Sequence, residues 1–307
     1  MTTVRAAPTY RSGTQSVEAN VPEASPEERG AALAFLQQLA TEVSEGTVDL
    51  PCFPNVVLRI SAALANPNTT SEHVVTIVGT EPRLAARLLQ TANSAAFNPS
   101  GKPLTELRSA VTRIGQHMVQ SIAMSYAVHQ MQHEASLVSI ARPLAKLRDK
   151  SIAVGSISQL VAERTKVHTD MAFLTGLLHG IGSLYIMARA AGRSGDLKNQ
   201  QSWLDILEGW QAPIGRAVLE SWGFAEQMCE AVGDQRDYER KWKHDASITD
   251  VLIVSLVLAE TLKNPEPRTV AMQGINAFAS IGLNATDCEA TMVRAERRIA
   301  LVHDALK

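Results

Sequence analysis

The stretch from Phe173 to Arg189, FLTGLLHGIGSLYIMAR, constrains the fold most, because it is long, apolar and periodic and has a histidine near its middle. Its large apolar residues recur every three or four positions, as the buried face of a helix requires. They are Leu174, Leu177, Leu178, Ile181, Leu184 and Tyr185. A face this apolar must be covered by other elements. We therefore predict a buried helix that carries His179 within it.

The same spacing recurs along the rest of the chain, in segments separated by proline, asparagine and glycine. The pairs Thr69–Glu72 and Thr286–Glu289 each place a carboxylate three residues after a hydroxyl, which predicts helix starts. One long helix is expected from Thr105 through Ile122, with Gly115 marking close helix packing. No segment alternates as a strand would. The sequence therefore predicts an all-α fold of many short helices.

The composition argues against several classes of function. The 29 Lys and Arg residues nearly balance the 31 Asp and Glu residues, giving a net charge of −2, so no global field favours nucleic acid or an anionic membrane. Cys52, Cys229 and Cys288 are odd in number, far apart and without zinc-site spacing, which indicates reduced thiols. No signal peptide is recognised, and no run approaches the roughly 18 apolar residues of a membrane span. We expect a cytoplasmic protein without a membrane span.

Three segments occur in a recognisable order: LPCFPNVVLRI, EPRLAARLLQTANSAAFN and PLTELRSAVTRIGQHMVQSIAM. Together they resemble the HDOD domain, a bacterial signalling module related to the HD and HD-GYP phosphohydrolases. The matching positions are Pro51, Pro54, Glu81 (where the family usually has aspartate), Asn93, Ser94 and Gly115. The resemblance continues through GLLHGIG to Gln235. It implies a multi-helix HD-like bundle in the bacterial cytoplasm, usually without catalysis.

Asn93 and Ser94 have two interpretations from the residues alone. They end a helical stretch, where asparagine and serine commonly cap the backbone. They could instead present an edge to a binding partner. Capping is the more common role for such residues.

Composition and the resemblance together divide the chain. We predict a disordered tail over residues 1–24, an N-terminal helix over 25–45, the HDOD domain over 46–245 and a helical segment over 246–307 that packs on it. Within the last segment, Arg294, Arg297 and Arg298 lie on the final helix and form a candidate partner surface.

The related hydrolases bind a divalent metal through several histidines, a His-Asp pair and a late aspartate. In this chain Lys150 falls at the first histidine, and Gly180 replaces the aspartate after His179. Other ligand positions are likewise substituted, with Gln211 and the pair Gln235–Arg236 where histidines are common and Leu258 near the final aspartate. A catalytic metal needs three or more protein ligands, so the resemblance implies no metal and no other cofactor. A relict polar pocket around His179, Gln211 and Arg236 is expected, where Arg236 could hold an anion.

The remaining histidines give weaker candidates. His129 and His133 share a helical face at a spacing that suits one metal, but without a third ligand they predict a surface pair. The dipeptides His244–Asp245 and His303–Asp304 lie in a charged loop and near the chain end, so neither predicts a site.

Two functions follow from these features. The first is a non-enzymatic signalling scaffold that binds a protein partner or a small signalling molecule through a degenerate HD-like domain. The second is a metal-dependent phosphohydrolase with an unrecognised ligand set, for example one that acts on a cyclic dinucleotide.

Overall fold

The computed structural model describes residues 30, 34–35, 37–39, 41–42, 45, 53–66, 68–94, 97–132, 134–191, 200–241, 245–262 and 272–305. Within these ranges every regular element is helical, which confirms the predicted all-α fold. The predicted tail over 1–24 lies outside the described residues, as do Pro51 and Cys52. The described residues between 30 and 42 are helical, and Glu42 among them pairs with Arg189 at 2.7 Å.

The helices follow one another through short connections. Their bounds are α2 Asn55–Ala65, α3 Ser71–Gly79, α4 Pro82–Ala92, α5 Leu107–Ile114, α6 Gln116–Gln132, the 3-10 helix η1 Ala135–Ile140, α7 Ala141–Ala162, α8 Thr169–Leu178, α9 Ile181–Ala191, α10 Gln200–Ser221, α11 Glu226–Gly233, α12 Ile248–Thr261, α14 Asn276–Ile281 and α15 Ala285–Ala305.

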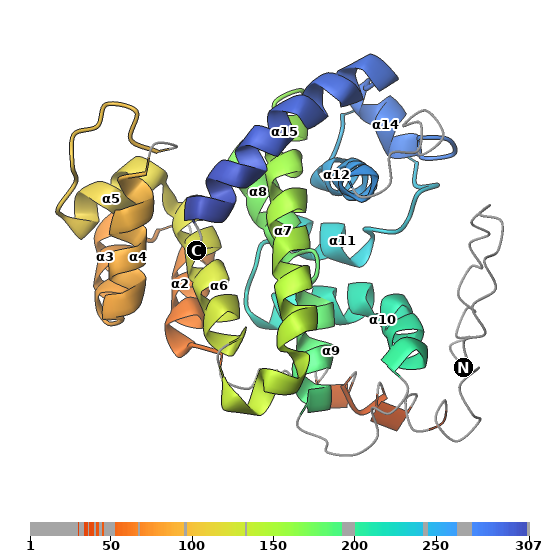
Figure 1. Cartoon of the computed structure of the whole chain (residues 1–307), viewed down its shortest axis with the longest axis horizontal. Coiled ribbons are helices and arrows are strands. Elements are labelled where there is room, and N and C mark those ends of the chain that lie inside the picture. The colour runs from red at the N-terminus through yellow and green to blue at the C-terminus, as the bar shows by residue number, and fades with distance from the viewer. Residues whose placement is uncertain are drawn as a thin grey trace.

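Helix α7 is the central element. It packs against α6, α8, α12 and α15, and Figure 1 shows it in the middle of the molecule, with α2 to α5 on one side and α10 to α12 on the other. The crossing of α7 and α8 is close because glycines meet there. A Cβ atom on Gly176 would lie 2.7 Å from the Cα atom of Gly155. This contact fixes the position of the predicted central stretch.

That stretch is two helices rather than one, so the prediction of a continuous helix is wrong. Helix α8 ends at Leu178 and α9 begins at Ile181, with His179 and Gly180 in the turn between them. The whole segment Thr169–Ala191 has the length and hydropathy of a membrane helix, which the sequence analysis did not recognise. Because 83% of its most apolar window is buried inside the protein, we interpret it as core.

The predicted helix from Thr105 to Ile122 is also divided. Gly115 separates α5 from α6 and has a φ of 77°, a conformation that glycine adopts without the steric cost of a side chain. A Cβ atom at this position would meet nothing within 4 Å. Gly115 therefore ends a helix, and the prediction that it marks close packing is wrong.

The C-terminal segment contains two helices of different character. All of α12 except Glu260 is buried, and it contacts α7, α8 and α11. Helix α15 packs against α7, which it crosses obliquely in Figure 1, and buries a narrower face of Cys288, Met292, Ala295 and Val302. The first helix therefore belongs to the core, whereas the second lies on its surface.

Candidate functional site

His179 lies in the turn between α8 and α9 and is only 4% exposed. Its Nδ1 atom is 2.7 Å from the carbonyl oxygen of Gly176. A carbonyl only accepts, so the neutral ring carries its proton on Nδ1 and leaves Nε2 as the acceptor. Backbone carbonyls orient metal-binding histidines in this way, so the local geometry suits a ligand. Whether a site exists depends on the neighbouring side chains.

The surroundings keep this imidazole neutral. Burial lowers the pKa of His179 from 6.5 to about 4, the hydrogen bond to Gly176 opposes this shift, and the positive charge of Lys150 lowers the pKa further. The unfolded chain therefore takes up this proton below about pH 6.5, whereas the folded chain resists it until about pH 4.

We expect the free energy of unfolding to fall as the pH drops from about 6.5 to about 4, by up to about 3 kcal/mol from His179 alone. His179→Gln removes this contribution because glutamine does not titrate. Urea unfolding at several pH values between 7.5 and 4.5 measures the difference in slope between the two proteins. Parallel pH profiles would contradict a buried neutral imidazole.

Gly180 is the residue that the resemblance assigns to the position of the hydrolases' aspartate. A Cβ atom placed there would lie 2.5 Å from Cδ1 of Leu147 on α7. The leucine side chain thus fills the space into which a carboxylate at position 180 would extend. A side chain at position 180 would therefore meet an apolar group of α7.

The residues at the other predicted ligand positions make ion pairs or hydrogen bonds with neighbouring residues of the protein. Lys150 on α7 is 3.7 Å from Glu260 on α12. Gln211 accepts a hydrogen bond from the Ser183 hydroxyl at 2.5 Å. Gln235 is 2% exposed and donates to the carbonyl oxygens of His179, at 3.1 Å, and of Val232, at 2.7 Å.

Two further positions complete the comparison with the predicted relict pocket. Arg236 is exposed, although it follows the buried Gln235 directly in sequence. Leu258, the position assigned to the final aspartate, is 1% exposed and belongs to the hydrophobic core. Of the predicted set, His179, Gly180 and Gln235 are in direct or adjacent contact, and Lys150 acts on His179 through its charge.

The other histidines do not assemble a ligand cluster. No group of three or more His, Cys, Asp or Glu residues in the described ranges could hold a metal. His129 is partly buried, whereas His133 and His244 lie outside the described residues. His303 is 3.6 Å from Asp149 on α7, so it contributes to helix packing.

The family-motif residues hold the N-terminal helices in place. Pro54 caps α2, and the preceding Phe53 stacks on Trp222 with ring centroids 4.8 Å apart. Glu81 precedes α4 and accepts a hydrogen bond from the Tyr126 hydroxyl at 3.1 Å. The first contact joins the start of α2 to the end of α10, and the second joins the start of α4 to α6.

Asn93 and Ser94 both bind backbone groups. The Asn93 amide donates to the carbonyl oxygens of Leu89 and Leu104, at 2.9 and 2.8 Å, and its oxygen accepts from the Leu104 amide at 2.7 Å. The Ser94 hydroxyl donates to the Thr91 carbonyl at 2.7 Å. Of the two sequence interpretations, these bonds favour capping over a binding edge.

Two arginines of α15 contact residues of α7 or its C-terminal cap. Arg294 pairs with Glu163 at 2.7 Å, and Arg298 donates to the Gln159 side chain at 2.6 Å. Gln159 in turn donates to Asp170 on α8 at 3.3 Å. Arg297 is exposed. Two of the three residues predicted as a partner surface therefore hold α15 against the helix beneath it.

We expect Arg298→Glu to lower the free energy of unfolding by about 2 kcal/mol, because it places a carboxylate beside the acceptor oxygen of Gln159 in a partly buried position. Arg297→Glu is the matched control one residue away and should change it by less than about 0.5 kcal/mol. Urea denaturation of both variants is the measurement. Equal stability of the two would show that the Arg298 contact is dispensable.

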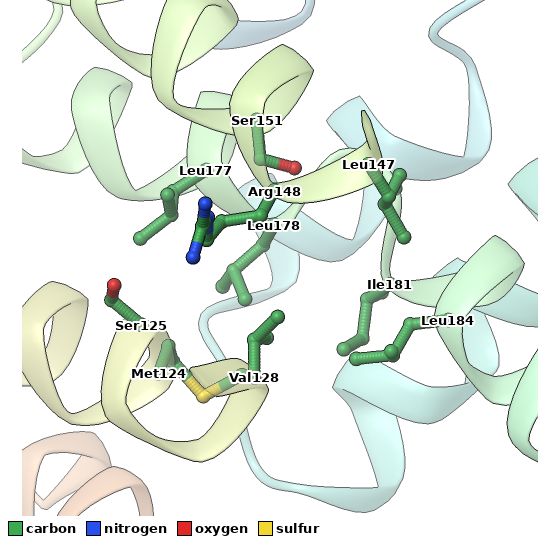
Figure 2. Close-up of a pocket in the computed structure, with 11 residues that line it drawn as sticks. Met124, Ser125, Val128, Leu147, Arg148, Ser151, Leu177, Leu178, Ile181 and Leu184 are labelled. Atoms are coloured by element: carbon green, nitrogen blue, oxygen red, sulfur yellow. The ribbon is translucent and has the colours of Figure 1, made fainter. Parts of the chain in front are cut away.

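A half-open cavity lies next to the relict site, between α6, α7, α8 and α9 (Figure 2). Its volume is about 30 Å³. Pockets for drug-sized ligands measure roughly 300 to 1,000 Å³, so a cyclic dinucleotide does not fit inside this one. The lining residues are Met124, Ser125, Val128, Leu147, Arg148, Ser151, Leu177, Leu178, Gly180, Ile181 and Leu184.

Sequence analysis missed this cavity. Ser125, Arg148 and Ser151 are its polar members, and they come from two helices whose relative placement the sequence does not specify. A weak signal exists, because Arg148 and Ser151 lie on either side of Lys150, the first relict position.

Comparison with known proteins identifies a family and a relative that this chain matches. The HDOD domain family matches residues 50–238, within the predicted range of 46–245. An uncharacterised protein from Treponema pallidum is 25% identical over 206 residues, which is 64% of this chain, and the match spans 39% of that longer protein.

Solved structures share the fold. One from Shewanella amazonensis, named as a candidate metal-dependent phosphohydrolase, has a TM-score of 0.61 and 24% identity and covers 87% of this chain and 99% of its own. An HDOD domain protein of unknown function from Geobacter sulfurreducens has a TM-score of 0.59 and 19% identity and covers 91% and 98%. Identities this low carry the fold and not the activity. Because the family match extends over more than half of the sequence, the chain belongs to the HDOD domain family.

Proposed function

We propose that this protein is a non-enzymatic bacterial regulatory protein that acts in the cytoplasm by binding a protein partner through its degenerate HD-like domain. The observation that carries the proposal is the chemistry around His179. One imidazole is retained, while Leu147 fills the space beside Gly180 and glutamine or lysine stands at further ligand positions. Lysine and leucine offer no lone pair that binds a metal at neutral pH.

The positive charge near His179 also disfavours a bound metal ion. A divalent cation at His179 Nε2 would lie near the positive charge of Lys150, which already disfavours a second positive charge on the ring. Metal-dependent hydrolysis requires a firmly held ion that activates water. This donor set supports regulation by association over hydrolysis.

The test uses the full-length protein. We expect metal analysis of the purified chain to give iron, manganese and zinc at background, with no turnover of generic phosphoesters or of cyclic dinucleotides. His179→Gln should leave both results unchanged and alter only stability. A stoichiometric metal, together with turnover that His179→Ala abolishes, would establish the alternative function, a metal-dependent phosphohydrolase with non-standard ligands.

A further inference from the structure

The N-terminal helix, described at residues 30, 34–35, 37–39 and 41–42, is amphipathic and packs on the rest of the protein. Figure 1 shows these residues in red beside the lower end of α9. Phe35 is 4% exposed and Leu39 is 0% exposed, and both belong to the hydrophobic core. Gln37 and Thr41 on the other side are exposed. The helix therefore buries two large apolar side chains that lie one turn apart.

A charged contact fixes this helix on α9. Both carboxylate oxygens of Glu42 accept hydrogen bonds from Nη2 of Arg189, at 2.8 and 2.7 Å, and one of them also accepts from the Tyr185 hydroxyl at 3.3 Å. The side chains of Glu42 and Arg189 are 20% and 29% exposed, so water screens their attraction only in part. Helix α9 thus presents a cation and a hydroxyl to a single carboxylate.

The N-terminal helix has the features of a removable cover. It precedes the range that matches the HDOD domain family, which begins at residue 50. Isolated short helices are marginal in water, so this helix depends on its docked position. Ordering its backbone also offsets much of what two buried side chains contribute. A segment with so few anchors opens locally at a lower free energy than the core beneath it.

We propose that the N-terminal helix occupies, within its own chain, a helix-binding site on α9, and that a helix of the protein partner competes for this site. The partner helix has the chemistry of the segment that it displaces. That segment places two large apolar side chains one turn apart and a carboxylate one turn further on, at Phe35, Leu39 and Glu42. A basic helix would instead bring a like charge to Arg189.

The competition makes association controllable. A helix on the same chain competes at a high effective concentration. The apparent dissociation constant for an added helix is the intrinsic value divided by the fraction of molecules in which the site is open. Weakening the contact within the chain should therefore tighten binding of an added helix. The inference rests on the proposed regulatory function, to which it adds the binding surface and the class of partner.

A synthetic peptide measures this competition in the full-length protein. The probe is a fluorescein-labelled peptide with the sequence of residues 26–45, and fluorescence anisotropy gives its apparent dissociation constant. We expect Glu42→Lys in the protein to tighten peptide binding at least about tenfold, because its own helix loses charge-assisted hydrogen bonds and brings a like charge to Arg189. Glu45→Lys changes an exposed carboxylate nearby and should bind the peptide as the wild type does.

Charge reversal on α9 tests where the peptide binds. The Arg189→Glu protein should prefer a peptide that carries Glu42→Lys, whereas the Glu42→Lys protein should prefer the wild-type peptide. This reversal identifies the site even where one variant changes stability. A Leu39→Ala peptide should bind at least about tenfold more weakly than a Gln37→Ala peptide, because Leu39 is buried in the docked helix and Gln37 is exposed.

Three results would overturn the proposal. Equal binding to the wild-type and Glu42→Lys proteins, or binding to neither, means that the helix is a fixed part of the fold. An unchanged peptide preference in Arg189→Glu means that the site lies elsewhere. A wild-type dimer in analytical ultracentrifugation that Glu42→Lys dissociates means that two copies exchange helices and no separate partner is needed. Because the peptide assay involves neither metal nor turnover, its result is independent of the assays that test the proposed function.

Discussion

Gly182→Ala is expected to lower the free energy of unfolding by more than about 3 kcal/mol, because α9 and α10 touch backbone to backbone at this glycine. A Cβ atom at position 182 would overlap the carbonyl oxygen of Gln211 and lie 2.7 Å from the amide nitrogen of Gly215. Neither is the flexible end of a side chain. The two helices must separate to accept even one methyl group, and the turn that holds His179 lies directly before α9.

The matched control for this substitution lies on the partner helix. Gly209 is an exposed residue of α10, and a Cβ atom there would meet nothing within 4 Å. Gly209→Ala should be neutral or stabilising by up to about 1 kcal/mol, because alanine is the better helix former. Urea denaturation of both variants gives the comparison. A Gly182→Ala protein as stable as the Gly209→Ala protein would show that the helices are not packed as closely as described.

The class of the fold could be predicted because apolar residues at helical spacing need no tertiary information to be recognised. The positions at which helices are interrupted were harder to predict. Gly115 and the His179–Gly180 turn both lie inside continuous apolar patterns, and in each case the pattern continues in phase on the far side. Periodicity records which face is buried and not whether the axis bends, so both segments were predicted as single helices.

Helix starts were misplaced by one or two residues for a related reason. Thr70, not Thr69, caps α3 by accepting from the His73 amide, while Asn284 and Asp287 form the reciprocal pair at the start of α15 instead of Thr286 and Glu289. Asn, Asp, Ser and Thr can all cap a helix, so several candidates compete where they cluster. The backbone geometry that decides among them depends on how each loop enters its helix.

For the candidate site as well, the sequence predicts some features and not others. The residue identities at the positions that resemble ligand positions, such as Gly180 after His179, can be read from the sequence. The contact between Leu147 and Gly180 could not be predicted, because only the folded chain brings these residues together. The same applies to Arg294 and Arg298, which are charged residues on a terminal helix by sequence but make contacts with α7 in the structure.

The C-terminal segment should tolerate the loss of α15 but not of α12. Deleting residues 246–307 removes α12, whose large apolar side chains are almost fully buried; they are Val251, Leu252, Ile253, Val254, Leu256, Val257 and Leu258. Each such side chain contributes about 1.5–3 kcal/mol by burial, so together they contribute about 10–20 kcal/mol, which is as large as the roughly 5–15 kcal/mol by which domains are stable. We expect this shortened chain to show no cooperative thermal transition.

Deleting only residues 285–307 removes a helix whose buried face is narrow and whose edge is held by polar contacts, including Arg164 with Asp287 at 2.8 Å and Arg294 with Glu163 at 2.7 Å. Exposed ion pairs of this kind contribute at most about 1 kcal/mol each. The protein that retains α12 should therefore unfold cooperatively at a reduced melting temperature, because α7 loses one covering helix while its packing against α8 and α12 remains. Thermal melts of the two deletions beside the full-length chain decide the matter. If the longer deletion melts like the full-length protein, α12 is an appendage; if the shorter one fails to fold, α15 is part of the core.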